Sequence, residues 1–338
     1  MKPYYEDDSV KLFHGRCEDV LPGLSVSGDV HLVTDPPYFG VKDEAWDNQW
    51  AEASEFLGWM GEWLDLAKPL LSANASVWVF ASPQLTSSVE RVVGDRFRVL
   101  NSVRWVKPQG WHQKADLGSA RSFLSPWEGI VFAEQYSDAY GEATKALHRE
   151  VFAPIGRYIH SERERAGVSR VEVQTWFPSA NGNATGALSN WELGYNMPTE
   201  AQYKRLRVLL NGGGGDYLRR EYDYLRREYE DLRREYEDLR RVFSISERGL
   251  SGDVWTFDTV PTYSGKHPCE KPEPLLAHII RTTTRPGDTI IDPFAGSGST
   301  LRVARQLGRK AIGIEMDPKW CEHATRRLGQ ASFDLEGL

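Results

Sequence analysis

The residues most suited to chemistry are Asp35-Pro36-Pro37-Tyr38, which follow the apolar run at residues 30–34. Each proline fixes its φ angle and lacks an amide proton, so a strand ending here leads into a rigid turn. That turn brings a carboxylate, a free carbonyl and an aromatic face into one small space. An amino group conjugated to a base ring is a poor nucleophile, and it needs hydrogen-bond acceptors and a flat ring that stacks on the base. The tetrapeptide therefore indicates amino-group chemistry on a nucleic-acid base, although two prolines can also simply end a strand.

A glycine-rich segment near the other end of the chain indicates a second binding element. Residues 288–292 are strand-like, and residues 293–300 lead from them into a helical pattern. Glycines let the backbone approach a ligand, and a helix N-terminus presents free amides to an anionic group. A further strand-like run at residues 310–314 ends at Glu315, which is placed to accept hydrogen bonds from ribose hydroxyls. A glycine-rich turn alone is weak evidence, but together with the proline motif it is strong.

Together the two segments resemble the S-adenosylmethionine-dependent DNA amino-methyltransferases, in the permuted order called the beta group. Asp35-Pro36-Pro37-Tyr38 is similar to the catalytic motif of that family, and Phe294-Ala295-Gly296-Ser297-Gly298 is similar to its cofactor motif. The catalytic motif comes first, as in the beta group. His267-Pro268-Cys269-Glu270-Lys271-Pro272 is similar to the segment that helps hold the methionine end of the cofactor. The resemblance covers residues 9–134 and 253–330.

The resemblance implies S-adenosyl-L-methionine as the cofactor and no metal. Arg16 departs from the pattern, because the family usually has an aspartate there that helps define the adenine pocket. We expect that contact to pass to the Cys17 backbone or to Glu18. The residues implied to contact the cofactor are Cys17, Asp35, His267, Lys271, Asp292, Phe294, Ala295, Gly296, Ser297, Gly298, Thr300, Glu315 and Met316.

The resemblance also implies the reaction. Within the family, an aspartate in the first place of the proline motif goes mostly with adenine N6, and a serine goes mostly with cytosine N4. We therefore expect site-specific methylation of adenine N6 in duplex DNA. Asp35 and the Pro36 carbonyl accept the amino hydrogens, Pro37 completes the turn, and Tyr38 stacks on a base rotated out of the helix. The alternatives are cytosine-N4 methylation, a DNA-binding regulator with a vestigial methylase domain, and a methyltransferase acting on RNA or on protein amides.

The formal net charge of −7 requires any DNA-binding surface to be a local patch. Residues 104–121 suit such a patch, since cations outnumber acids there and alternate with indoles and amides, although an ordinary exposed loop is the alternative. Soon after the proline motif, Trp46 is either part of a loop that closes over the base or a core residue. The residues expected to contact DNA are Trp46, Lys107, Gln109, Trp111, Gln113, Lys114, Arg121, Asn183, Thr185 and Ser189.

Residues 135–252 form an expected target-recognition insertion between the two parts of the catalytic domain, 1–134 and 253–338. Within it, residues 150–211 resemble a repressor-type helix-turn-helix, with Ser169 as the N-cap of a helix that ends at Trp176. In that resemblance the following helix, at residues 183–190, faces a DNA major groove. The turn between these helices is longer than usual, so a helical packing unit without DNA contact is the alternative.

A seven-residue repeat occupies residues 216–243, after four consecutive glycines. Leucines at 218, 225, 232 and 239 alternate with aromatic residues and form a single a/d stripe on one helix. Arginines and acids nearly cancel in this segment, which favours a salt-bridged helix over a DNA-binding one. We expect the stripe to pack on the catalytic domain or on a second chain, which makes a homodimer one expected assembly.

The remaining sequence predicts an α/β fold: a doubly wound, seven-stranded methyltransferase sheet with a helical DNA-recognition insertion. With 338 residues, 40% of them hydrophobic, the chain can bury a domain of about 200 residues and a further module. Ligands of such sheets bind at the carboxyl ends of the strands, where both motifs fall. Strands are expected at 10–13, 30–34, 76–80, 97–105, 129–133, 288–292 and 310–314, and catalytic-domain helices at 52–67, 84–93, 272–284, 299–307 and 318–328.

Three widely spaced cysteines argue against a disulfide framework, and no apolar run is long enough to span a membrane. We therefore expect a cytoplasmic protein. No endonuclease motif stands out, so the expected partners are double-stranded DNA and, if the protein is not an orphan, a separate cognate restriction endonuclease.

Overall fold

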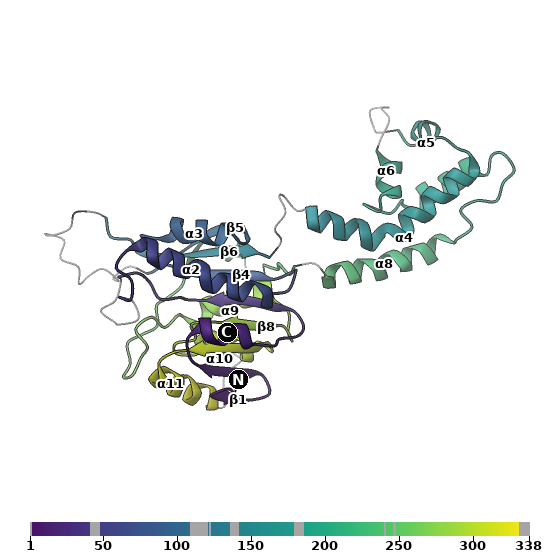
Figure 1. The fold of residues 1–338 in the computed structure, drawn as a ribbon. Coiled ribbons are helices and arrows are strands. Elements are labelled where there is room, and N and C mark those ends of the chain that lie inside the picture. Colours follow the sequence, from purple (N-terminus) through teal and green to yellow (C-terminus); the bar gives the residue numbers. More distant parts are fainter. Residues whose placement is uncertain are drawn as a thin grey trace. The chain divides into compact units, whose positions relative to one another are not determined.

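The computed structural model describes residues 2–40, 48–108, 121, 123–135, 142–178, 186–239, 241–245 and 248–330. The chain divides into two compact units: Met1–Ser137 with Arg241–Leu338, and Asp138–Arg240. The first unit contains the sheet and the second is helical (Figure 1).

The boundary of the insertion differs from the expected one on its C-terminal side, because residues 241–245 belong to the first unit. The Arg241 guanidinium donates to the Glu134 carboxylate over 2.7 Å. The Phe243 ring stacks on Phe132 with centroids 6.0 Å apart, and the Ser244 amide donates to the Thr282 carbonyl over 2.8 Å. These contacts return the chain to the sheet directly after the helical unit.

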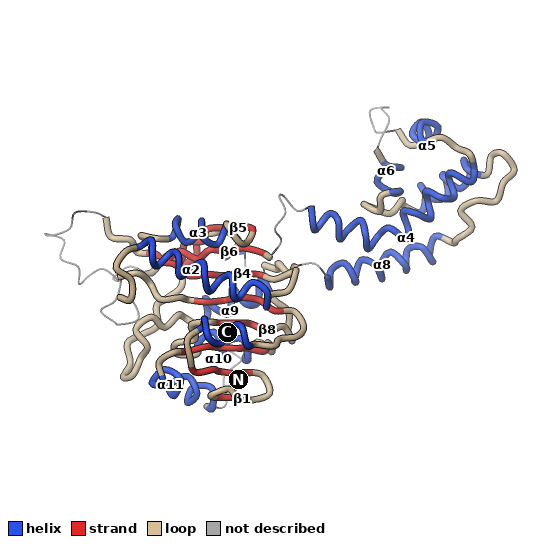
Figure 2. Tube along the Cα trace, in the orientation of Figure 1, coloured by secondary structure: helices blue, strands red, loops and turns tan. Residues whose placement is uncertain are grey.

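One nine-stranded sheet forms the centre of the first unit, in the order β1-β2-β9-β8-β3-β4-β6-β5-β7 (Figure 2). Seven of its strands are those predicted from the sequence. The other two, β1 (Tyr5–Glu6) and β7 (Val254–Thr256), are edge strands too short to show a periodic pattern. The seven predicted strands are β2 (Val10–His14), β3 (Val30–Thr34), β4 (Ser76–Ala81), β5 (Arg98–Val106), β6 (Trp127–Glu134), β8 (Thr289–Asp292) and β9 (Lys310–Glu315).

The middle of the sheet is parallel. β3 pairs with β4 on one side and with β8 on the other, with Leu32 opposite Ile291, and every residue of these three strands is buried. Such strands read as continuous apolar runs because helices cover both faces of a parallel sheet. The register places the turn after β3 beside the loop after β8, although the two lie far apart in the sequence.

Helices cover both faces of this sheet, as the doubly wound prediction requires. One buried cluster joins the sheet to the helices of the C-terminal part, and the other joins the opposite face to the helices of the N-terminal part. The helices of this unit are α1 (Cys17–Val20), α2 (Ala53–Ala67), α3 (Thr86–Gly94), α9 (Glu273–Thr283), α10 (Ser299–Gln306) and α11 (Pro318–Gly329), with short 3-10 turns at Leu21–Gly23, Lys68–Leu70 and Arg248–Leu250.

The helical unit has a core of its own. Its first helix contains Pro154 in its interior. Ser169 caps α5 as expected, its hydroxyl accepting from the Glu172 amide over 3.2 Å, and Thr199 begins α7 with a reciprocal capping box. The helices are α4 (Glu142–Ala166), α5 (Arg170–Trp176), α6 (Ala187–Glu192), α7 (Glu200–Leu210) and α8 (Tyr222–Leu239).

The heptad stripe packs on α4 of the same unit, a partner that the sequence did not indicate. Leu225 on α8 is 1% exposed, and the Tyr229 ring lies 4.9 Å from the Phe152 ring of α4. The helix also begins later than predicted. Leu218 has a φ of +52°, outside the helical region, and its amide donates to the buried Glu162 carboxylate over 2.7 Å.

No helix among the described residues combines the length and the apolar character needed to cross a membrane.

Replacing Leu225 with alanine tests the packing of α8 on α4. Loss of this buried side chain should lower the free energy of unfolding of the helical unit by about 2–5 kcal/mol. Urea titration of the full-length protein, followed by hydrogen exchange of amides in α4 and α8, measures the change. Leu239→Ala is the matched control, because Leu239 belongs to the same stripe but is 46% exposed. Equal effects of the two substitutions would contradict the packing described here.

Candidate active site

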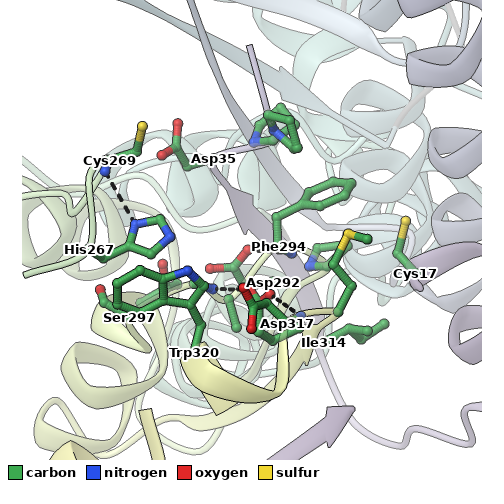
Figure 3. A pocket seen from close by; sticks show the side chains of 18 of the residues that line it. Cys17, Asp35, His267, Cys269, Asp292, Phe294, Ser297, Ile314, Asp317 and Trp320 are labelled. Carbon is green, nitrogen blue, oxygen red and sulfur yellow. Dashed lines mark hydrogen bonds between the residues drawn. The ribbon is translucent and has the colours of Figure 1, made fainter. Parts of the chain in front are cut away.

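A cavity of about 560 Å³ lies at the carboxyl ends of β3, β8 and β9. The proline turn (residues 35–38) follows β3, the glycine loop (residues 293–298) follows β8, and Glu315 ends β9. The 267–273 segment, which leads into α9, supplies another wall. Figure 3 shows side chains from these elements, including Asp35, His267 and Phe294, gathered around the cavity.

The structure brings together nearly all residues that the sequence placed in the site. All four residues of the proline turn line the cavity. Gly298 is the one predicted cofactor residue that does not; its φ is +76°, and a Cβ there would come within 3.0 Å of the Ala324 Cβ, so it serves the packing of α11. The predicted cofactor residues that line the cavity are Cys17, Asp35, His267, Lys271, Asp292, Phe294, Ala295, Gly296, Ser297, Thr300, Glu315 and Met316.

Backbone amides hold the Glu315 carboxylate in place. The Gly296 amide donates to Oε2 and the Asp317 amide donates to Oε1, each over 2.8 Å. Gly296 has a φ of +50°, and a Cβ at this position would lie 3.2 Å from the His267 ring. A carboxylate oxygen has lone pairs beyond the one that each amide uses, so Glu315 can still accept from ligand hydroxyls.

Asp292 is a buried carboxyl beneath the cavity. The Thr34 hydroxyl donates to it over 2.7 Å and the Phe294 amide over 3.1 Å. Burial nevertheless dominates and raises its pKa to about 6.

Aromatic rings wall the cavity, and the sequence analysis did not single out two of them. Trp59 of α2 lies 5.3 Å from Phe294, and Trp320 of α11 lies 4.4 Å from His267, ring centroid to ring centroid. In the sequence Trp59 looks like a core residue of an amphipathic helix, so its pattern carries no functional signal. Trp320 lies in the first turn of α11, just after the N-cap Asp317, and this proximity to Glu315 was the sequence signal that could have placed it near the site.

Arg16 stands where the family pattern has an aspartate, but the nearby Glu18 still supplies a carboxylate to the site. The Arg16 guanidinium pairs with Glu18 over 3.1 Å, and the Trp59 indole donates to the same carboxylate over 2.5 Å. Glu18 and Cys17 both line the cavity, so Glu18 stays the candidate for the contact that the family pattern assigns to an aspartate.

These residues fit a nucleoside carrying an amino-acid tail. Aromatic rings offer stacking surfaces, Glu315 offers an acceptor for hydroxyls, and the glycine loop lets backbone approach the ligand closely. In the described part of the chain, no three His, Cys, Asp or Glu side chains gather as metal ligands would.

A network of buried charges surrounds the proline turn. The Lys271 ammonium donates to Asp35 Oδ2, and the Tyr38 hydroxyl lies 2.9 Å from Asp35 Oδ1 and 3.1 Å from Glu128 Oε2. Glu128 also pairs with Lys271 over 3.5 Å and with Lys107 over 2.6 Å. Two carboxylates and two ammonium groups thus balance one another around the Tyr38 hydroxyl.

The network shifts the pKa values of its two carboxylates in opposite directions. Burial, opposed by Lys271 and reinforced by Glu128, raises the pKa of Asp35 above its ordinary value. Burial also opposes ionisation of Glu128, but Lys271 and Lys107 outweigh it and hold the pKa of Glu128 below its ordinary value. The sequence analysis missed Glu128, because a lone acid at the start of a strand has no distinctive spacing.

The structure describes three of the residues that were predicted to contact DNA: Lys107, Arg121 and Ser189. The Lys107 ammonium points into the charge network beside Glu128, a position at odds with phosphate binding. Arg121 is exposed, and Ser189 is half-buried on α6. The other predicted contacts lie outside the described residues: Trp46, Gln109, Trp111, Gln113, Lys114, Asn183 and Thr185.

Replacing Asp292 with asparagine should remove a pH-dependent cost of folding. Because its folded pKa of about 6 exceeds the ordinary 3.8, Asp292 binds a proton more readily in the folded state. Its favourable contribution is complete below pH 3.8 and is lost as the pH rises through 6. Asp292→Asn should therefore raise the free energy of unfolding at pH 7 by about 2–3 kcal/mol and flatten its slope between pH 4 and 6.

Thermal and urea unfolding across that pH range measures the effect. Asp95→Asn, at an exposed site after α3, controls for the loss of one carboxylate. An unchanged pH slope in Asp292→Asn would show that Asp292 is ionised as easily in the folded as in the unfolded chain.

Comparison with known proteins identifies the family. Residues 30–326 match the model of a family described as DNA methylase. The chain is 25% identical to the type II methyltransferase M2.DpnII of Streptococcus pneumoniae, over 97% of this chain and 92% of that protein. It is 22% identical to the type II methyltransferase M2.MboI of Moraxella bovis, over 97% and 91%.

A solved structure shares the fold. The PvuII DNA methyltransferase, described as cytosine-N4-specific, superposes with a TM-score of 0.55 at 13% identity, over 98% of this chain and 91% of that one. The motif order, the cavity and the family match agree: the chain belongs to the DNA methylase family and is an S-adenosylmethionine-dependent DNA methyltransferase.

Proposed function

We propose that this enzyme methylates N6 of an adenine within a specific sequence of duplex DNA. The observation that carries the proposal is the position of Asp35. Its half-buried carboxylate accepts from the Tyr38 hydroxyl, in the same cavity as the glycine loop and Glu315. An acceptor next to an aromatic face is what an exocyclic amino group and its base require.

Asp35 and Pro36 of the proline turn act directly on the amino group in this proposal. S-adenosylmethionine, when bound, supplies a methyl group on a positively charged sulfur. Asp35 and the Pro36 carbonyl accept the amino hydrogens and turn the nitrogen lone pair toward the methyl group. Lys271 and Tyr38 use two of the roughly four acceptor sites of a carboxylate, which leaves capacity for the base. The raised pKa of Asp35 suits it to take the proton that the methylated nitrogen gives up.

Adenine is favoured over cytosine by the aspartate in the first place of the proline turn, since the family resemblance associates that residue mostly with adenine. The PvuII enzyme, described as cytosine-N4-specific, has the same fold, so the fold by itself is compatible with both bases. The complete set formed by Asp35, the glycine loop and Glu315 supports a working enzyme over a vestigial domain.

The two units suggest a division of labour. We assign catalysis to the unit that holds the cavity, and target recognition to the helical unit with its capped α5 and following α6. Ser189 on α6 and Arg121 of the first unit remain proposed DNA contacts. The names of the type II relatives support a role in restriction-modification beside a separate endonuclease, and a DNA substrate supports a cytoplasmic location.

Labelled S-adenosylmethionine and duplex DNA of mixed sequence test the base assignment. After digestion to nucleosides, label should appear in N6-methyladenine. Asp35→Ala should reduce the rate by about a thousandfold, because a preorganised acceptor is lost. Asp95→Ala, at an exposed site after α3, should leave the rate unchanged. Label in N4-methylcytosine alone would refute the adenine assignment.

Replacing Glu128 with glutamine tests the charge network. Asp35 must be ionised to accept the amino hydrogens, so activity should decline at acid pH as it protonates. Glu128 raises the pKa of Asp35, and its neutralisation should move the acidic limb of the kcat/KM profile to lower pH. Glu134→Gln is the matched control, since Glu134 lies on the same strand but pairs with Arg98 and Arg241. An acidic limb that stays in place, or moves up, counts against the network.

A further inference from the structure

We propose that Arg327 is a positioning residue for the methionine end of the cofactor, acting through the two segments that face it. Arg327 lies in the last turn of α11 and does not itself line the cavity. It connects the glycine loop to the 267–273 segment. The inference rests on the cofactor site described above and names a residue outside the family motifs.

The guanidinium of Arg327 reaches both segments at once. On the glycine loop side, Nη1 donates to the Ser297 carbonyl over 3.1 Å and to the Ser299 hydroxyl over 3.0 Å. On the other side, Nη1 pairs with Glu270 over 3.0 Å and Nη2 donates to Glu273 over 2.9 Å. Its side chain is only 16% exposed, so solvent screens these contacts weakly.

Glu270 and Glu273 depend on this cation. The Glu270 side chain is 4% exposed and lines the cavity, and Arg327 is its cationic partner, with the Tyr263 hydroxyl donating to its other oxygen over 2.6 Å. Glu273, in the first turn of α9, also pairs with Arg302 over 2.5 Å. Removing one partner of a buried ion pair leaves the other charge without compensation, which drives it to protonate or to move.

Both segments meet directly at the cavity. Ser297, Ser299 and Glu270 line it, and the Gly296 backbone approaches the His267 ring so closely that a Cβ would lie 3.2 Å away. Arg327 bonds to both segments at this junction from outside the cavity. Only a planar fork of donors can serve a carbonyl, a hydroxyl and two carboxylates at once, so lysine keeps the charge but loses most of the geometry.

The position of the junction predicts which part of the cofactor depends on it. In the proposed binding mode, Glu315 accepts from the ribose hydroxyls, and the 267–273 segment together with Ser297 holds the amino-acid tail. A displaced junction should therefore weaken binding of ligands that carry the tail. It should leave ligands that lack the tail unaffected, which a general loss of stability would not do.

Calorimetry on the full-length protein tests this, with S-adenosylmethionine and with 5′-methylthioadenosine, which has the nucleoside but lacks the amino-acid tail. Arg327→Met should raise the Kd for S-adenosylmethionine about tenfold or more, the size expected for loss of a charge-assisted hydrogen bond. Arg327→Lys should have a smaller effect in the same direction. The Kd for 5′-methylthioadenosine should stay within about twofold of wild type in both variants.

Arg326→Met is the matched control, because Arg326 is the adjacent residue of α11 but is 69% exposed and lies 3.8 Å from its partner Glu322. It should bind both ligands as wild type does. In activity assays, Arg327→Lys should raise the KM for S-adenosylmethionine and leave kcat and the KM for DNA nearly unchanged.

The outcomes distinguish a failure of the inference about Arg327 from a failure of the cofactor site itself. Unchanged S-adenosylmethionine binding in Arg327→Met, or equal weakening of both ligands, overturns the inference about Arg327. If Arg327→Met fails to fold, Arg327→Lys decides by the same comparison. A wild-type protein that binds neither ligand refutes the cofactor site itself.

Discussion

The parallel pairing of β3 with β8 is the constraint on which the site depends. The two strands are separated in the chain by nearly the whole catalytic unit and the helical insertion, yet they run side by side with Leu32 opposite Ile291. Their common direction sends both chains out at the same edge of the sheet. The proline turn and the glycine loop therefore lie at the same edge of the sheet, and the Thr34 hydroxyl donates to Asp292 across the pair. Methyl acceptor and methyl donor can be held together because two strands share an edge.

The charge network around Asp35 is a second constraint, and it concerns energy more than position. Burying a single carboxylate is costly, and a balanced group of opposite charges lowers that cost. Asp35, Glu128, Lys271 and Lys107 form such a group, with the Tyr38 hydroxyl between the acids. The acid meant to meet the base keeps a raised pKa, while its neighbour stays ionised. The same group of charges thus lowers the cost of burial and gives its two carboxylates pKa values shifted in opposite directions.

Much of this could be predicted from the sequence, for physical reasons that differ by element. The buried parallel strands β3, β4 and β8 are apolar runs, and the antiparallel β5 and β6 are long, so these strands were visible, whereas β1 and β7 are too short to be seen. Helix α4 runs through Pro154, a residue that usually begins or breaks a helix, and the packing of the adjacent Phe152 on α8 cannot be read from the local sequence. Lys107 was expected at the surface, but the neighbouring strand β6 presents Glu128 to it. Pairings across strands, such as this one, leave no trace in local spacing.

The return of the chain after the helical unit has a consequence for how such enzymes change specificity. The first unit ends its sixth strand at Glu134 and takes up the chain again at Arg241, and these two residues are joined by an ion pair of 2.7 Å. The two ends of the inserted segment are therefore held together by residues of the catalytic unit. The helical unit's own core, built around α4 and α8, shares no strand with the sheet. During evolution, one helical unit can be exchanged for another at that point while the β3–β8 edge stays as it is.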